Sequence, residues 1–299
     1  MSDLRDQLQH ALGDAVSLDR ELAGGVESRL FTAAETASGR RIVVKVITPR
    51  HASEHFADRF AREVKFAARL QHDHIVPLLG AGVVGEFAYY TMPFVEGASL
   101  RARLAGGAPL PVEDASRILR DVAAALVYAH DQGVVHRDLR PEHVLLSSGG
   151  ALVTSFGIAK ALTASHTMEI TTESLADVSG TLTSAGSALG TPAYMSPEQA
   201  VGNVVDARCD LYAWGVIAYE ALTGTHPFAD RVTPHTMIAA HLTERPQPLA
   251  ERNAAVPAPV ADIVMRCLEK DADSRPASAT ELLAAIDGEP PPPVAKGTM

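Results

Sequence analysis

The sequence predicts an α+β protein with two lobes, a small β-rich lobe followed by a larger α-helical one. Strand-like apolar runs bounded by turn residues dominate from Leu22 to Met92. After Gly97 the apolar residues recur at helical spacing instead. With 46% hydrophobic residues in 299, the chain can bury a full core. We expect four segments: an N-terminal helical extension (1–20), the β-rich lobe (21–95), the α-helical lobe (96–288) and a proline-rich tail (289–299).

The N-terminal extension is expected to form a short leading helix, and the first lobe a small sheet and one longer helix. Leu4, Leu8 and Leu12 recur four residues apart and form an apolar stripe on the leading helix. The longer helix is expected between His51 and Leu70, where apolar residues again recur at helical spacing. Strands are expected within Leu22–Ile47, where turn residues interrupt the apolar runs, and at Ile75–Ala81 and Phe87–Met92.

Two long, fully packed helices are expected in the second lobe. One ends at Gln132-Gly133, and the other, which contains Trp214, ends at Gly224. Between them, Ala164–Leu189 is rich in Ser and Thr and has almost no large apolar side chains, which predicts a long loop. The run of prolines after Glu289 predicts an extended linker.

The composition narrows the classes of partner and location. A net charge of -10 argues against a nucleic-acid backbone or an anionic membrane as the principal partner. No apolar run reaches the length of about 18 residues that a membrane span needs, and the charged N-terminus is unlike a secretory signal. Cys209 and Cys267 are expected to be free thiols in a reducing compartment. We therefore expect a cytoplasmic protein.

A series of short motifs carries a resemblance to a known family. They are Val43-Val44-Lys45, Glu63, His136-Arg137-Asp138, Ser155-Phe156-Gly157, Gly190–Glu198, Asp210 and Arg275. In this order and at these distances, from Leu22 to Ile286, they resemble the bacterial eukaryotic-like (Hanks-type) serine/threonine protein kinases. The resemblance implies a bilobal protein-kinase-like fold with one regulatory helix in the small lobe. It also implies that Arg275 pairs with Glu198.

The resemblance implies which residues would hold ATP. Lys45 would contact the α- and β-phosphates, and Glu63 would hold that lysine in place. Met92, Phe94 and Val95 correspond to the hinge that binds adenine.

The glycine-rich loop of the family corresponds here to Ala23-Gly24-Gly25-Val26-Glu27-Ser28. Only the middle glycine of the family pattern is kept, and Gly24 and Gly25 are the loop residues assigned to the nucleotide. Alanine and serine tolerate unusual backbone angles less well than glycine, so close approach to phosphate is less favourable. Glu27 would also repel phosphate.

Catalysis is assigned by the resemblance to the loop after His136. Asp138 would accept or orient the proton of a substrate hydroxyl, and Arg140, in place of the family's lysine, would bring positive charge near the transferred phosphate. His136 is interpreted as a core histidine that braces this loop. Arg137 is suited to bind a phosphorylated loop residue.

Two positions depart from the family pattern where the family holds magnesium. The family uses the Asp of Asp-Phe-Gly and an Asn five residues after the catalytic Asp, and these positions are Ser155 and His143 here. A neutral hydroxyl and an imidazole are poor ligands for this hard cation, so Mg²⁺ is not expected, whereas Mn²⁺ stays open. Without metal stabilisation, transfer would slow on the order of a thousandfold or more.

These departures predict a pseudokinase that acts in signalling through protein contacts and binds ATP weakly or not at all. The alternative is a low-activity or Mn²⁺-dependent serine/threonine kinase that transfers the γ-phosphate of ATP to protein Ser or Thr, with Asp138 as base. A third interpretation is a regulator whose 163–187 loop is phosphorylated by an active kinase, although this loop could equally be only a solvated connection. The expected partners are other signalling proteins.

Overall fold

The computed structural model describes residues 4–24, 28–47, 56–85, 87–158 and 192–289. Among them, the residues up to Glu96 together with 155–158 form one compact unit, the N-terminal unit, and the others form a second, the C-terminal unit. Gly25, Glu27, the 163–187 loop and the prolines after Glu289 lie outside the described residues. The expectations for these segments therefore stay predictions.

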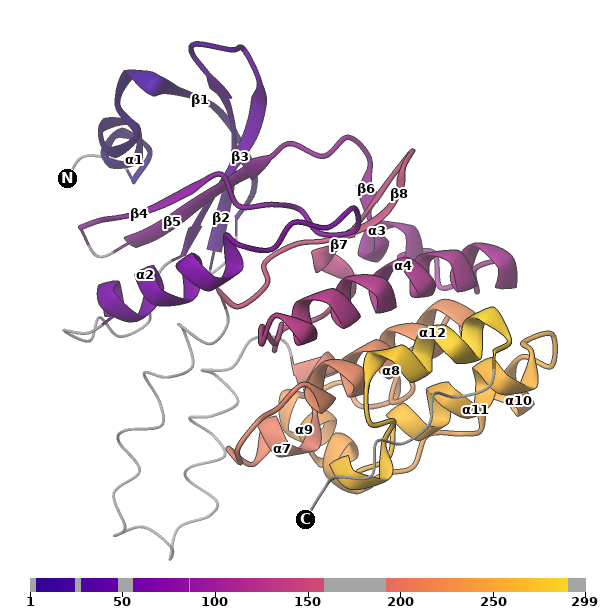
Figure 1. The fold of residues 1–299 in the computed structure, drawn as a ribbon. Helices are drawn as coiled ribbons and strands as arrows, with labels where there is room; N and C mark the ends of the chain where they lie inside the picture. Colours follow the sequence, from indigo (N-terminus) through magenta and orange to yellow (C-terminus); the bar gives the residue numbers. More distant parts are fainter. Residues whose placement is uncertain (1–3, 25–27, 48–55, 86, 159–191, 290–299) are drawn as a thin grey trace, which may run out of the picture. The chain divides into compact units, whose positions relative to one another are not determined.

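The N-terminal unit is built on an antiparallel five-stranded sheet with the order β1-β2-β3-β5-β4 (Figure 1). The strands are β1 (Val16–Gly24), β2 (Ser28–Glu35), β3 (Arg41–Ile47), β4 (Gly80–Val84) and β5 (Phe87–Pro93). Two helices, α1 (Leu4–Leu12) and α2 (Phe56–Ala67), accompany this sheet. α1 contacts β1 and β4, and α2 contacts β4. The predicted leading helix and the predicted longer helix are both confirmed.

Successive side chains of β3 point to opposite faces of the sheet. Ile42, Val44 and Val46 join a buried cluster that also contains Leu8 of α1, so the apolar stripe of α1 packs into this core. Lys45 has the opposite parity and is half-buried, which places it on the other face. The strand that carries Lys45 is therefore anchored by its neighbours and not by the lysine itself.

The first strand begins earlier than predicted. β1 starts at Val16, whereas the sequence predicted strand structure only from Leu22. The pairing of β1 with β2 shifts register between Leu18 and Glu21 and again after Glu21. Such irregularities break the alternation of buried and exposed side chains, so the pattern did not reveal the strand.

The fourth strand is displaced from its predicted position. β4 covers Gly80–Val84, whereas the sequence predicted Ile75–Ala81. Ile75 and Val76 are buried, but they lie outside any strand. The apolar run at these residues reflects their burial and not strand structure. The following Pro77 also has no N–H to donate to a sheet.

The C-terminal unit combines a small three-stranded sheet with a group of helices (Figure 1). The sheet has the order β6-β7-β8, from β6 (Ala98–Ser99), β7 (Val144–Ser147) and β8 (Gly150–Val153). The described α-helices are α3 (Leu100–Leu104), α4 (Val112–Asp131), α7 (Pro197–Ala200), α8 (Arg208–Thr223), α9 (Pro234–Thr243), α10 (Leu249–Arg252), α11 (Ala258–Cys267) and α12 (Ala279–Asp287). An α+β chain with a helical second lobe is therefore confirmed.

Helix α8 lies at the centre of this unit, because it is buried on all sides along most of its length. It contacts both α4 and α11. The indole N–H of Trp214 donates to the carbonyl oxygen of Leu119 in α4 at 3.1 Å. α8 ends before Gly224, whose φ of 76° is the left-handed conformation typical of a helix C-terminus, as predicted.

Both cysteines of the chain are free, as predicted, and both are buried in the C-terminal unit. Burial raises the pKa of the Cys209 and Cys267 thiols, so both stay protonated and unreactive. Within the described ranges, no helix has the length and apolar character to cross a membrane.

Candidate nucleotide and catalytic site

In the N-terminal unit, Lys45 forms a polar cluster with Tyr90 and Ser155. The Lys45 Nζ donates to Ser155 Oγ at 3.2 Å, and the Tyr90 hydroxyl and Ser155 Oγ form a hydrogen bond of 2.9 Å. Tyr90 lies beside Lys45 because β3 and β5 pair in this register. An ammonium group can only donate, so the serine oxygen accepts from it. The structure brings Lys45 and Ser155 together and adds Tyr90, which sequence reasoning missed.

Ser155 has an unusual backbone conformation. Its φ is 70°, in the left-handed region that costs a residue with a Cβ roughly 1–2 kcal/mol. Phe156 and Ile158, which follow it, are both buried. The hydrogen bonds of Ser155 and the packing of its neighbours together offset this cost.

The predicted adenine hinge, Met92, Phe94 and Val95, lies at the end of β5. Met92 is buried, and Phe94 and Val95 are half-buried. The Phe94 N–H donates to the Arg41 carbonyl oxygen at 3.1 Å, and the Arg41 guanidinium lies 4.3 Å from the centroid of the Phe94 ring. Two contacts to β3 therefore fix the position of this segment.

The other residues assigned to the nucleotide lie on two different elements. Glu63 is half-buried on α2, and Gly24 is the last residue of β1, where it pairs with Arg29 of β2. The contact of Glu63 with Lys45 and the role of Gly24 stay predictions, as does the role of Gly25 outside the described residues.

In the C-terminal unit, Asp210 organises the predicted catalytic loop. Its carboxylate accepts hydrogen bonds of 2.8 Å from the backbone N–H groups of His136 and Arg137 and from His130 Nε2. Complete burial would raise the pKa of Asp210, but the bonds from His130 and from the His136 backbone hold it below its ordinary value. A charged Asp210 therefore fixes the start of the loop.

Two histidines hold the backbone of Asp138 from both sides. The Asp138 N–H donates to His136 Nδ1 at 3.2 Å, so the His136 Nε2–H donates to the Thr154 carbonyl oxygen at 2.8 Å. The His143 Nδ1–H donates to the Asp138 carbonyl oxygen at 2.7 Å. The side chain of Asp138 is 47% exposed, and its Oδ2 lies 3.5 Å from His143 Nδ1. This geometry agrees with the interpretation of His136 as a brace.

The two arginines of the loop differ in their surroundings. Arg137 has a φ of 66°, and its Nη2 lies 3.5 Å from the Val205 carbonyl oxygen. Arg140 is half-buried, and its Nε lies 3.6 Å from Glu142 Oε2. Glu142 therefore partly neutralises the charge that Arg140 was predicted to bring to a phosphate, and that role stays a prediction.

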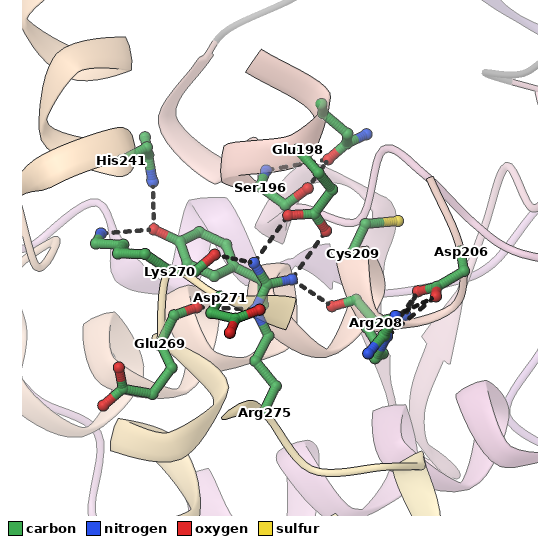
Figure 2. Close-up of polar contacts among 12 residues, drawn as sticks. Ser196, Glu198, Asp206, Arg208, Cys209, His241, Glu269, Lys270, Asp271 and Arg275 are labelled. Atoms are coloured by element: carbon green, nitrogen blue, oxygen red, sulfur yellow. Dashed lines mark hydrogen bonds and ion pairs between the residues drawn. The ribbon is translucent and has the colours of Figure 1, made fainter. Parts of the chain in front are cut away.

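A buried ion pair joins Glu198, at the end of the Gly190–Glu198 motif, to the body of the C-terminal unit. Figure 2 shows the Arg275 guanidinium facing the Glu198 carboxylate, with two parallel hydrogen bonds of 2.8 Å. The remaining N–H groups of Arg275 donate to the carbonyl oxygens of Glu269, Arg208 and Lys270. All five donors of the guanidinium are used, which makes this pair well satisfied despite its burial. The predicted pairing of Arg275 with Glu198 is confirmed.

Two histidines hold the same segment. The Nε2–H of His241 in α9 donates to the Ala193 carbonyl oxygen at 2.9 Å, and its Nδ1 accepts from the Tyr212 hydroxyl at 2.8 Å. Lys270 Nζ in turn donates to the Tyr212 hydroxyl at 3.3 Å. His226 Nε2 also donates to Ala193, at 2.7 Å. Sequence reasoning missed this cluster, since its members are far apart along the chain.

Comparison with known proteins identifies the family. The Protein kinase domain family matches residues 16–285. The chain belongs to the protein kinase family. Serine/threonine-protein kinase pkn2 of Myxococcus xanthus is 36% identical over 274 residues, which are 89% of this chain and 31% of that relative. Serine/threonine-protein kinase PknB of Mycolicibacterium smegmatis is 34% identical over 284 residues, 93% of this chain and 43% of that relative.

The family and the bilobal kinase fold predicted from the motifs are thus confirmed, including the similarity to bacterial serine/threonine kinases. The N-lobe is the five-stranded sheet with its helices, and the C-lobe is the helical unit. The kinase domain spans less than half the length of these two relatives, 31% and 43%. The activity and partners of the whole protein are therefore a matter for proposal.

Proposed function

We propose that this kinase domain is a pseudokinase, which acts in signalling through protein contacts and binds ATP weakly or not at all. The observation that carries the proposal is the bond between the Lys45 ammonium and Ser155 Oγ, 3.2 Å long. Where the family has a metal-binding carboxylate, this chain has a neutral hydroxyl that faces a cation. A divalent cation on the same oxygen would be repelled by that ammonium.

The residues at the two metal positions of the family do not fit Mg²⁺. This ion prefers carboxylate and other hard oxygen ligands. The Ser155 hydroxyl is already bonded to Lys45 and Tyr90, and His143 supplies nitrogen, which suits softer ions. Over the part of the chain that the structure describes, no group of three or more His, Cys, Asp or Glu side chains could hold a metal ion. The proposed function therefore contains no magnesium-dependent step.

A second candidate is a serine/threonine kinase of low activity, and Asp138 favours it. The Asp138 side chain is 47% exposed, and its backbone is held by His136 and His143. Such a carboxylate can accept the proton of a substrate hydroxyl, while Lys45 and Arg140 contact phosphate. Dependence on Mn²⁺ belongs to this candidate, because an imidazole is a better ligand for Mn²⁺ than for Mg²⁺.

Calorimetric titration of ATP without metal, with Mg²⁺ and with Mn²⁺ tests the proposal, together with transfer of labelled γ-phosphate to a generic protein substrate. For a pseudokinase, neither metal raises the ATP affinity, and transfer stays at the level of the Asp138→Asn variant. Binding strengthened by Mg²⁺, with transfer that Asp138→Asn abolishes, would overturn the proposal. Transfer only with Mn²⁺ would establish the second candidate.

The double variant Ser155→Asp with His143→Asn tests which positions limit the domain. It restores the two residue types that the family uses for Mg²⁺. A gain in Mg²⁺-dependent ATP affinity would assign the defect to these two positions. Unchanged affinity and turnover would instead assign it to another part of the site.

We infer that the partners are other signalling proteins in the cytoplasm, among them an active kinase that phosphorylates the 163–187 loop. The net charge of -10, which disfavours nucleic acid and anionic membranes, supports a protein partner. Incubation with an active serine/threonine kinase, followed by mass spectrometry, tests this role. Absence of phosphate from the 163–187 loop, while a known substrate in the same tube is modified, would contradict it.

A further inference from the structure

Tyr90 places a phenol in the interior of the N-terminal unit. Its side chain is 0% exposed, although its hydroxyl is polar. A buried hydroxyl needs a hydrogen-bond partner, because its desolvation is otherwise uncompensated. Ser155 Oγ, at 2.9 Å, supplies that partner. The requirement of Tyr90 for a partner therefore bears directly on the conformation of Ser155.

The backbone of Ser155 needs such support. A serine with φ of 70° stays in this sparsely populated region only where its surroundings determine it. Its Oγ is held from two adjacent strands, by Lys45 of β3 and by Tyr90 of β5. The hydroxyl pair can be satisfied with either oxygen as donor.

We propose that Tyr90 is a positioning residue of this site. Through its bond to Ser155 it holds residues 155–158 in one conformation in the absence of nucleotide and metal. Phe156 and Ile158 add apolar packing to the same segment, since both are buried. This inference concerns the site of the proposed pseudokinase, but it rests on contacts that exist whether or not the domain transfers phosphate.

Hydrogen–deuterium exchange of peptides that contain residues 155–158, measured without ATP or metal, tests the inference. Tyr90→Phe removes the hydroxyl and keeps the ring, so the sheet is expected to fold. Loss of one neutral hydrogen bond should speed local exchange about 3–10-fold. Tyr89→Phe is the matched control, because it makes the same change at the preceding residue of β5. It should leave the exchange of residues 155–158 unaltered.

A double-variant comparison separates positioning from a general loss of stability. If Tyr90 acts through Ser155, then Ser155→Ala alone should speed exchange, and adding Tyr90→Phe should have little further effect. If Tyr90 only packs the core, the two effects should multiply. Multiplied effects, an unchanged rate in Tyr90→Phe, or an equal effect of Tyr89→Phe would each overturn the proposal.

The outcome is independent of the proposed function. The exchange experiment contains no nucleotide and no phosphate acceptor, so a positive transfer assay would overturn the pseudokinase proposal and leave this result unaffected. Conversely, a domain without activity could still fail the exchange test. The two failures are therefore distinguishable.

Discussion

Lowering the pH from 7 to 5 is expected to destabilise the kinase domain by about 2 kcal/mol through His241 alone. Burial, together with the nearby His226 and Lys270, lowers the pKa of His241 from 6.5 to about 3. In the structure its Nδ1 accepts from Tyr212 and its Nε2–H donates to Ala193. A second proton on the ring would therefore break the bond from Tyr212.

The direction of this pH effect follows from the pKa of His241 in the unfolded and in the folded state. The unfolded chain takes up a proton on His241 near pH 6.5, whereas the folded domain takes it up only near pH 3. Between these values the unfolded state binds more protons, so this contribution to stability is nearly complete at neutral pH and falls as the pH falls. Linkage gives a loss of about 0.2 kcal/mol at pH 7 and about 2 kcal/mol at pH 5. His226, whose pKa burial also lowers, adds a loss in the same direction.

Urea unfolding at pH 7 and at pH 5 measures this effect in the parent domain and in His241→Gln. Glutamine cannot titrate, and its Nε2 can still donate to Ala193. The variant should be less stable at pH 7, yet its further loss on going to pH 5 should be smaller than that of the parent by about 2 kcal/mol. His235→Gln, which changes an exposed histidine of the same helix, should lose as much as the parent. Equal losses in the parent and His241→Gln would refute the reasoning.

Two substitutions in the C-terminal unit are expected to lower its stability for different reasons. A Cβ at Gly215 would lie 2.6 Å from the Cys267 Cβ, so Gly215→Ala should lower the free energy of unfolding, measured in urea, by about 1–3 kcal/mol. Gly106→Ala is the control and should change it little, because a Cβ there would have nothing within 4 Å. Equal effects of the two alanines would contradict this. Arg275→Lys should lower the free energy of unfolding by about 3–5 kcal/mol in the same assay, because it leaves the Glu198 carboxylate poorly paired. A loss below about 1 kcal/mol would show that the ion pair is dispensable.

Much of the fold followed from local patterns in the sequence. The apolar stripe of α1, the long helices α4 and α8, and the strand that carries Lys45 all depend on neighbours within a few residues. The first strand was not recognised at Val16, because its pairing with β2 is irregular and alternation is lost there. Local patterns thus predict an element well only where its pairing is regular.

The motifs identified the family and the positions of Lys45, Asp138 and Ser155, but they did not reveal what these residues contact. Tyr90 is 65 residues from Ser155, and its role depends on the pairing of β3 with β5. The histidines that hold Ala193 are likewise brought to it only by the tertiary fold. No motif signals such contacts, because each partner alone resembles an ordinary core residue.

Weak binding of ATP, as proposed for this domain, sets a limit on how far ATP can stabilise it. A ligand that binds the folded state stabilises it by RT ln(1 + [L]/Kd), about 0.4 kcal/mol when its concentration equals Kd and about 2.7 kcal/mol at a hundred times Kd. Weak binding with a Kd of about 1 mM should therefore raise Tm by only about 1–2 °C in about 1 mM ATP.

The same measurement separates a metal-dependent site from a metal-independent one. With Ser155 bonded to Lys45, Mg²⁺ should leave this small shift unchanged. Lys45→Met is the control, and it should abolish the shift if the shift arises at this site, because it removes the cation that attracts phosphate. A rise of several degrees that appears only when Mg²⁺ accompanies ATP would mean that the cation and the triphosphate bind together, and that a neutral hydroxyl at Ser155 is no obstacle to them.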